Sequence, residues 1–362
     1  MAPIDGSSWA WSGSLSSWST FLCVVLGTAP TDGCSVSVAL HKGKEGDALI
    51  ALALKSAELK TGLVLGGGGL AGVSFHAAAL AALEVDLGWD ARKADVILGT
   101  SAGALTGALL RLGVSGTDLA AFVSGAPLPA SHFLVRQGVR LPELPAVRWQ
   151  HFVPRPQRIL RLGSALRSPS ALFRMLPDGQ VDLRPHFDFL DPLGDEWPPG
   201  DLRICAVNED DHELVVWGGA GGVHLTDAIV ASSSIPGYAT TVVIGDRSYV
   251  DGGLRSPTNA DVLIHDDLDL ALILSPMTPD SGSNLGLTGI LKRWASRRLA
   301  REVRMLRRAG TEVIVLRSPA ALGRAATNPF LSLHKRPRGA VAEAFLSVGE
   351  QTPRLGELLG EA

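Results

Sequence analysis

Two glycine-rich turns, each between an apolar strand and an apolar helix, constrain the fold of this chain more than any other feature. The first turn, residues 66–72, joins a strand predicted over 61–65 to a helix predicted over 72–87, where apolar residues recur at helical spacing. The second turn, residues 99–103, repeats this arrangement after a strand predicted over 95–98. Consecutive units of strand, turn and helix form parallel strands with right-handed crossovers. We therefore expect an α/β fold.

The other apolar segments extend this pattern and set the domain limits. Further strands are predicted over 203–207, 213–217, 241–244, 270–274 and 312–316. We expect one domain over 56–320, with a Pro-rich and Arg-rich insertion at about 126–200 and a helical C-terminal tail over 321–362 that packs on it. Residues 1–55 have no basic residue ahead of their apolar run, so we expect an N-terminal extension, disordered or upstream of the true start, and no secretory signal.

Composition excludes several classes of protein. The 362 residues are 46% hydrophobic, which excludes disorder as the main state. Lys and Arg number 33 against 36 Asp and Glu, a net charge of -3, so the chain as a whole is not a strongly basic nucleic-acid binder. Three scattered cysteines are too few for a disulfide framework or a Cys-rich zinc site, and their odd number fits a reducing compartment. We expect a cytoplasmic protein without a metal or a nucleic-acid partner.

The first glycine turn has the features of an anion-binding loop. Its residues lack a Cβ, so their backbone N–H groups can face a ligand at a helix N-terminus, where the helix dipole favours negative charge. Gly67, Gly69 and Gly72 also match the spacing of a dinucleotide site. That site needs an acidic residue at the end of the next strand, where this chain has Gly99 and Thr100. We therefore favour an anion other than a nucleotide.

The second turn is a G-x-S-x-G motif with Ser101 at its centre. A serine between a strand and a helix is held out at the carboxyl end of the strand, and the flanking Gly99 and Gly103 relieve steric crowding. The ordinary alternative is a turn serine in a glycine-rich chain. Because neighbouring parallel strands end side by side, amides of the first turn can point at a carbonyl that Ser101 attacks. Ser101 is therefore the candidate nucleophile.

A serine nucleophile needs a partner that accepts its proton. His265 lies in a polar turn and His334 in a basic segment, and each fits a solvated residue better than a catalytic base. Asp251 ends a short apolar segment and precedes two glycines, which permit a sharp turn and a close approach of another segment. The alternative for Asp251 is a simple Asp-Gly hairpin turn. The sequence by itself does not bring Asp251 to Ser101.

In this order, the glycine-rich turn, the G-x-S-x-G motif and a distant Asp-Gly-Gly resemble the bacterial patatin-like phospholipases. Residues 231–236, which precede the Asp-Gly-Gly, resemble the Ala-Ser-x-x-x-Pro block of that family, and the resemblance covers residues 61–262. It implies a three-layer α/β/α sandwich around a mostly parallel sheet. It also implies hydrolysis of acyl esters, of phospholipids or other lipids, without a metal or an organic cofactor.

The resemblance assigns roles to particular residues. Ser101 corresponds to the nucleophile and Asp251 to its partner in a Ser-Asp dyad that works through an acyl-enzyme. The backbone amides of Gly67, Gly68 and Gly69 correspond to the oxyanion hole.

One departure from the family pattern leaves two other functions open. The family loop commonly carries a basic residue where this chain has Ala71, so stabilisation of an oxyanion would depend on backbone amides alone. A catalytically weak lipid-binding protein is therefore one alternative. A serine acyltransferase of the malonyl-transfer type is another, although it would need a histidine partner and an arginine for the malonyl carboxylate.

Two segments carry concentrated positive charge. Residues 131–185 contain nine Arg and three acidic residues, and residues 291–308 contain eight basic residues and one acid. The ordinary interpretation is a solvated insertion and a helix that packs on the sheet with a basic outer face. On a lipid hydrolase, the same segments could rest on anionic headgroups, each Arg contributing about 1 kcal/mol. Peripheral contact with an anionic membrane stays open, beside the expected lipid or acyl-ester substrate.

Overall fold

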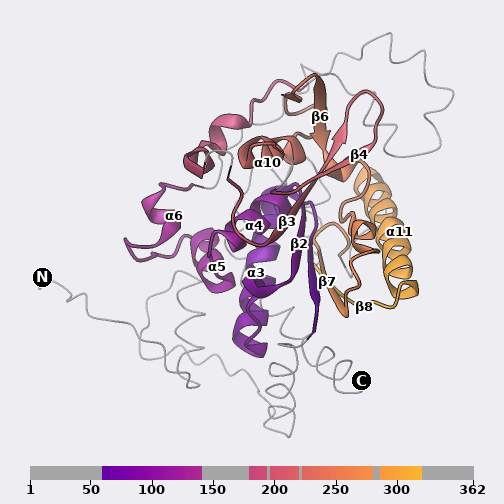
Figure 1. Cartoon of the computed structure of the whole chain (residues 1–362), viewed down its shortest axis with the longest axis horizontal. Helices are drawn as coiled ribbons and strands as arrows, with labels where there is room; N and C mark the ends of the chain where they lie inside the picture. Colours follow the sequence, from indigo (N-terminus) through magenta and orange to yellow (C-terminus); the bar gives the residue numbers. More distant parts are fainter. Residues whose placement is uncertain (1–58, 141–178, 194–195, 220–221, 280–285, 320–362) are drawn as a thin grey trace, which may run out of the picture.

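The structure, a computed structural model, describes residues 59–140, 179–193, 196–219, 222–279 and 286–319 (Figure 1). The expected N-terminal extension, most of the expected insertion and the expected C-terminal tail lie outside the described residues. What they form therefore stays a prediction.

Eight strands form one sheet in the order β5-β6-β3-β2-β1-β7-β8, with β4 paired to β3. The strands are β1 (Thr61–Leu65), β2 (Val96–Thr100), β3 (Asp201–Asn208), β4 (Leu214–Trp217), β5 (Val242–Ile244), β6 (Arg247–Asp251), β7 (Leu270–Ser275) and β8 (Glu312–Arg317). Five neighbouring strands, β3, β2, β1, β7 and β8, are parallel. Strands β4, β5 and β6 each pair antiparallel with their neighbours. Every residue of β1, β2 and β7 is buried, as expected for parallel strands covered on both faces.

Helices cover both faces of the sheet, α11 on one side and the others on the opposite side (Figure 1). The helices are α3 (Gly69–Leu87), α4 (Ala102–Arg111), α5 (Gly116–Ser124), α6 (Phe133–Arg136), α10 (Leu225–Ser233) and α11 (Gly286–Arg308). Alternate strand residues divide between the two layers: Leu63 packs with the α3, α4, α5 and α10 side, whereas Val64 packs with Leu299 and Leu306 of α11. The expected three-layer α/β/α sandwich is confirmed.

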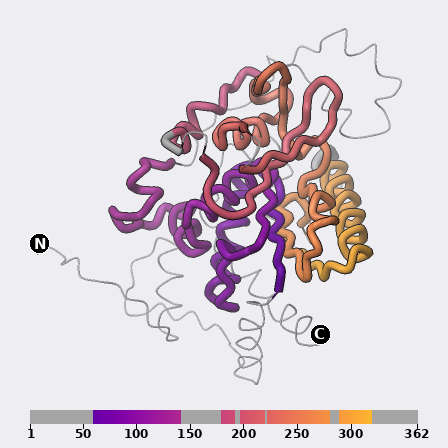
Figure 2. Tube along the Cα trace, viewed as in Figure 1, coloured from indigo at the N-terminus to yellow at the C-terminus, as the bar shows by residue number. Residues whose placement is uncertain are grey.

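The chain trace in Figure 2 shows that the sheet joins distant parts of the sequence, since β1 near the N-terminus lies beside β7. Helix α3 begins at Gly69, three residues earlier than predicted, so the first glycine turn supplies the first turn of the helix. Within the described part, α3 alone is long and apolar enough to span a membrane. Since 78% of that stretch is buried inside the protein, its composition is accounted for by its place in the core.

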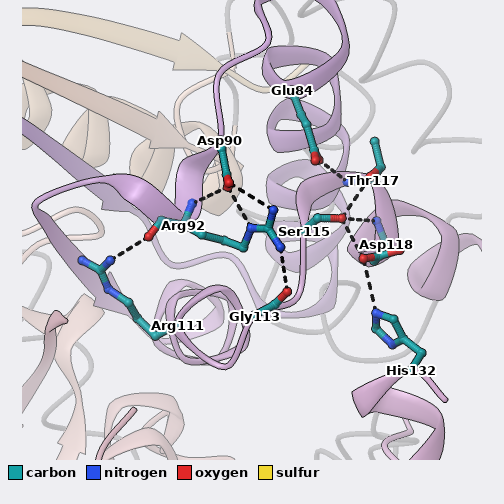
Figure 3. Close-up of polar contacts among 9 residues, drawn as sticks. All are labelled: Glu84, Asp90, Arg92, Arg111, Gly113, Ser115, Thr117, Asp118 and His132. Atoms are coloured by element: carbon teal, nitrogen blue, oxygen red, sulfur yellow. Dashed lines mark hydrogen bonds and ion pairs between the residues drawn. The ribbon is translucent and has the colours of Figure 1, made fainter. Parts of the chain in front are cut away.

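A polar cluster lies at the end of the sheet where the strands β2 and β3 begin (Figure 3). Arg92 forms an ion pair with Asp90 at 2.8 Å. Arg111, at the end of α4, donates to the carbonyl oxygens of Ala94 and Asp201 at 2.7 and 3.0 Å. Both glycine turns follow the opposite, carboxyl ends of the strands, so this cluster supports the fold away from them.

Candidate active site

Ser101 lies in a strained turn between β2 and α4. Its φ of 55° and ψ of -118° place a non-glycine residue in a region that L-residues rarely adopt. Such strain persists only where the surrounding structure enforces it, and it is typical of functional sites. The residue is 5% exposed.

Both flanking glycines are required by close packing of the main chain. A Cβ on Gly99 would lie 2.6 Å from the Cα of Ala104, and one on Gly103 would lie 1.8 Å from the carbonyl oxygen of Leu65 in β1. Real Cβ atoms do not approach other atoms this closely. The turn that presents Ser101 can therefore form only with glycine at these positions.

Asp251 reaches Ser101 because β2 and β6 share one edge of β3. Thr100, the last residue of β2, pairs with Cys205, and Asp251, the last residue of β6, pairs with the next residue, Ala206. The other edge of β3 is occupied by β4 at these same positions. Strand β6 therefore pairs with the same side of β3 as β2 does, starting where β2 ends and the chain turns at Ser101. As a result, Asp251 lies beside Ser101.

The Asp251 carboxyl group is almost completely buried, with 6% of the residue exposed. Burial raises the pKa of Asp251 from its ordinary value to about 7, and hydrogen bonds from the Gly253 amide and the Ser101 side chain lower it in part. The Gly253 amide donates to Oδ1 of Asp251 at 2.7 Å. The structure thus brings the two side chains together and gives the carboxyl group a pKa near neutrality.

The glycine-rich turn packs directly against Ser101. A Cβ on Gly67 would lie 3.4 Å from the Cβ of Ser101. The Gly67 amide donates to the carbonyl oxygen of Pro257 at 2.8 Å, so it is not free for an oxyanion, and the expected set of three donors reduces to two. Gly68 and Gly69 stand at the start of α3, where amides have no acceptor within the helix, and no other acceptor is found for them among the described residues.

The block 231–236 joins the serine to the acid, a role that its sequence did not reveal. Ser232 accepts a hydrogen bond from the Ser101 amide at 2.8 Å and donates one to the carbonyl oxygen of Cys205 at 2.7 Å. The carbonyl oxygen of Ser234 accepts from the Asp251 amide at 3.0 Å. The end of α10 therefore holds the backbone of both residues at once.

No histidine assumes the role of base in the described part of the chain. His265 is exposed in the loop that precedes β7, and His334 lies outside the described residues. His76 is fully buried between α3 and α4, where burial lowers its pKa to about 3 and its Nδ1 lies 3.3 Å from the Thr106 hydroxyl. The described residues also contain no group of three or more His, Cys, Asp or Glu that could hold a metal ion.

Comparison with known families agrees with this arrangement. The family model described as patatin-like phospholipase matches residues 63–264, more than half of the chain. The chain belongs to the patatin-like phospholipase family. This membership supports lipid acyl hydrolase activity in general and agrees with the observed α/β/α fold.

Two further comparisons concern curated proteins and solved structures. No curated protein is similar enough to this chain to count as a match. Among solved structures, twelve chains match, and one of them is VipD from Legionella pneumophila. VipD is 14% identical over 83% of this chain and 67% of its own, with a TM-score of 0.42.

The packing of Gly103 against β1 can be tested with a matched pair of alanine variants on α4. Gly103→Ala should lower the free energy of unfolding by about 3 kcal/mol or more, because its Cβ meets a main-chain oxygen that cannot move aside. Gly107→Ala should cost clearly less, because its Cβ meets methyl groups of Ile97 and Leu202 at 3.0 and 3.1 Å and of Leu65 at 3.7 Å but no main-chain atom, and alanine favours the helix by about 1 kcal/mol. Urea denaturation measures both; equal losses would contradict this interpretation.

Proposed function

We propose that this protein hydrolyses acyl esters of lipids, phospholipids among them, with Ser101 as the nucleophile and Asp251 as its general base. The observation that carries the proposal is the contact between the Ser101 side chain and a buried carboxyl group whose pKa lies near neutrality. Two amides at the start of α3, for which the described residues offer no acceptor, lie in the turn that packs against the serine. Together these groups provide the nucleophile, base and oxyanion donors that acyl transfer requires.

The reaction would proceed in two halves. Oγ of Ser101 attacks the ester carbonyl while Asp251 accepts its proton, and the negative charge that develops on the carbonyl oxygen is stabilised by the Gly68 and Gly69 amides. The intermediate collapses to the acyl-enzyme, and Asp251 returns the proton to the departing alcohol. Water then attacks the acyl-enzyme with Asp251 again as base, which releases the fatty acid and restores the Ser101 hydroxyl. Each oxyanion donor is worth about 10² to 10³ in rate, and the dipole of α3 adds to both.

Two features bear on the alternative functions. An acyltransferase of the malonyl-transfer type would pair its serine with a histidine, whereas Ser101 here contacts a carboxyl group. The Ala71 position, which the family commonly fills with a basic residue, is 1% exposed and packs in the core. The missing cation leaves the Gly68 and Gly69 amides unchanged, so we favour an active hydrolase over a silent lipid-binding protein.

Substitution of the two dyad residues tests the proposal. Ser101→Ala and Asp251→Asn should each abolish hydrolysis of a soluble p-nitrophenyl ester, and Ser101→Ala should abolish labelling by a fluorophosphonate probe. Both variants should remain folded, as circular dichroism and thermal unfolding can show. Hydrolysis that persists in Ser101→Ala would remove this serine from the mechanism, and an unlabelled, inactive wild type would favour the lipid-binding alternative.

The pH dependence of the reaction gives an independent test. Because burial raises the pKa of Asp251 to about 7, the carboxylate that can accept a proton is lost as the pH falls through neutrality. We expect kcat/KM to rise about tenfold per pH unit below pH ~7 and to level off above it. A profile that stays flat down to pH ~5 would place the ordinary carboxyl pKa at this site and contradict the assignment.

We also propose that the outer face of α11 contacts anionic membranes. Arg297, Arg301, Arg304 and Arg308 follow one another every three or four residues and are exposed, while Glu302, the one acid of the helix, is 3% exposed and faces inward. Like charges at this spacing destabilise a helix by themselves, and anionic headgroups would offset that repulsion. The expected membrane contact of the Arg-rich insertion falls mostly outside the described residues, so the proposal depends on α11.

Membrane contact can be tested with two variants that each lose three positive charges. Arg297, Arg301 and Arg304 replaced together by Gln should weaken sedimentation with vesicles rich in phosphatidylglycerol by about 100-fold at low salt, at about 1 kcal/mol per Arg. The control, with the exposed Lys60, Lys93 and Arg247 replaced by Gln, should bind as the wild type does, because these residues lie outside both basic segments. Hydrolysis of the soluble ester should be unchanged in both, and equal loss of binding in the two variants would contradict a specific role for α11.

A further inference from the structure

The segment that follows Asp251 runs through the interior of the protein without forming a strand. Residues 252–261 lead from the end of β6 toward β7 in two short 3-10 turns, and Ser256, Thr258 and Asn259 are at most 1% exposed. Buried irregular backbone must find hydrogen-bond partners, because water cannot supply them. Some of these partners lie within the segment, and the others lie in the glycine-rich turn, in the turn of Ser101 and on α11.

Two contacts connect the segment to the glycine-rich turn and to the nucleophile turn. The carbonyl oxygen of Pro257 accepts the hydrogen bond from the Gly67 amide at 2.8 Å. The side-chain amide of Asn259 donates to the hydroxyl of Thr100 at 3.1 Å, and Thr100 directly precedes Ser101. The same amide donates to the carbonyl oxygen of Gly252 at 3.2 Å, next to Asp251. Any movement of this segment would therefore displace the glycine-rich turn, the turn of Ser101 and the backbone next to Asp251 together.

One side chain from a distant element fixes the segment. Glu302 lies on the inner face of α11, and its Oε2 accepts hydrogen bonds from the Thr258 hydroxyl at 2.5 Å and from the Ala260 amide at 3.1 Å. These two donors stand on either side of Asn259. A buried carboxyl group is costly unless it is hydrogen-bonded, and here its hydrogen-bond partners Ser256, Thr258 and Ala260 all belong to the segment behind the active site.

We propose that Glu302 is a positioning residue for the reaction: by holding Thr258 and Ala260, it fixes the glycine-rich turn through Pro257 and the nucleophile turn through Asn259. The inference rests on the proposed hydrolase function. Glu302 lies outside residues 63–264, which match the family model, so the match to the family assigns it no role.

A purely structural role is the competing explanation, and it makes a different prediction. If Glu302 only attached α11 to the sheet, its loss would resemble the loss of any buried apolar contact of that helix. Leu306 provides this control, because it is fully buried on α11 in the apolar cluster with Val64 and Leu299. Leu306→Ala should lower the unfolding temperature and leave kcat unchanged.

Glu302→Gln is the conservative control, because its amide oxygen can take the place of Oε2 and keep both hydrogen bonds, so kcat should stay near that of the wild type. Glu302→Met tests the proposal at similar side-chain volume: the Thr258 hydroxyl and the Ala260 amide lose their acceptor, so the segment should shift. We expect kcat for the soluble ester to fall by about 10- to 100-fold with KM within about twofold of the wild type, since small misplacements of reacting groups reduce rate more than binding. Labelling by the fluorophosphonate probe should slow by the same factor.

Hydrogen exchange of backbone amides separates this proposal from the hydrolase function itself. In Glu302→Met, the Gly67 and Ala260 amides should exchange faster, whereas Glu302→Gln and Leu306→Ala should leave Gly67 as protected as in the wild type. Wild-type kcat together with wild-type exchange at Gly67 in Glu302→Met would overturn the proposal. If the wild type neither hydrolyses esters nor reacts with the probe, the hydrolase function fails, and exchange at Gly67 alone then decides whether Glu302 positions this turn.

Discussion

The active site depends on a single change of partner along one edge of β3. At Cys205 the edge is paired with β2, and at Ala206 it is paired with β6. A parallel strand that ends in a tight turn leaves unpaired backbone groups on its neighbour, and β6 supplies their partners. Because β6 ends in Asp251, satisfying the backbone of β3 also delivers the acid to the serine. The proximity of Ser101 and Asp251, on which the proposed dyad depends, is therefore a consequence of sheet pairing.

The local parts of this site could be predicted from sequence, because their causes lie within a few residues. Glycines around Ser101 are needed for a turn that packs against β1, and a strand, a turn and a helix follow one another in the chain. The alternation of strands and helices likewise indicated the layered fold. The role of Asp251 could not be predicted in this way, because the residues around it by themselves favour a hairpin turn, and only the resemblance to a family connected Asp251 with Ser101.

The other contacts of the site could not be predicted, because each joins segments far apart in the sequence. The acceptor of the Gly67 amide is Pro257, so nothing near the glycine-rich turn shows that one of its amides is already used. Ser232 lies in a block whose pattern was visible, but a pattern does not show that its hydroxyl holds the Ser101 amide. Glu302 looked like the single acid of a basic helix, and only the structure shows that it faces inward.

Burial raises the pKa of Asp251 to a value that suits the proposed base, and it also makes the carboxylate form unfavourable for the folded protein. The native carboxyl group, with a pKa of about 7, binds its proton more tightly than the unfolded chain, where the ordinary value is 3.8. The contribution of Asp251 to the free energy of unfolding therefore falls as the pH rises from about 4 to about 7, the range over which the native carboxyl group loses its proton. The strained Ser101 and the buried Glu302 add further costs. Ser232, Ser234 and Glu302 accept hydrogen bonds that hold this unfavourable arrangement in place, and Asn259 donates others, so weakening these bonds should relax the site before it unfolds the sheet.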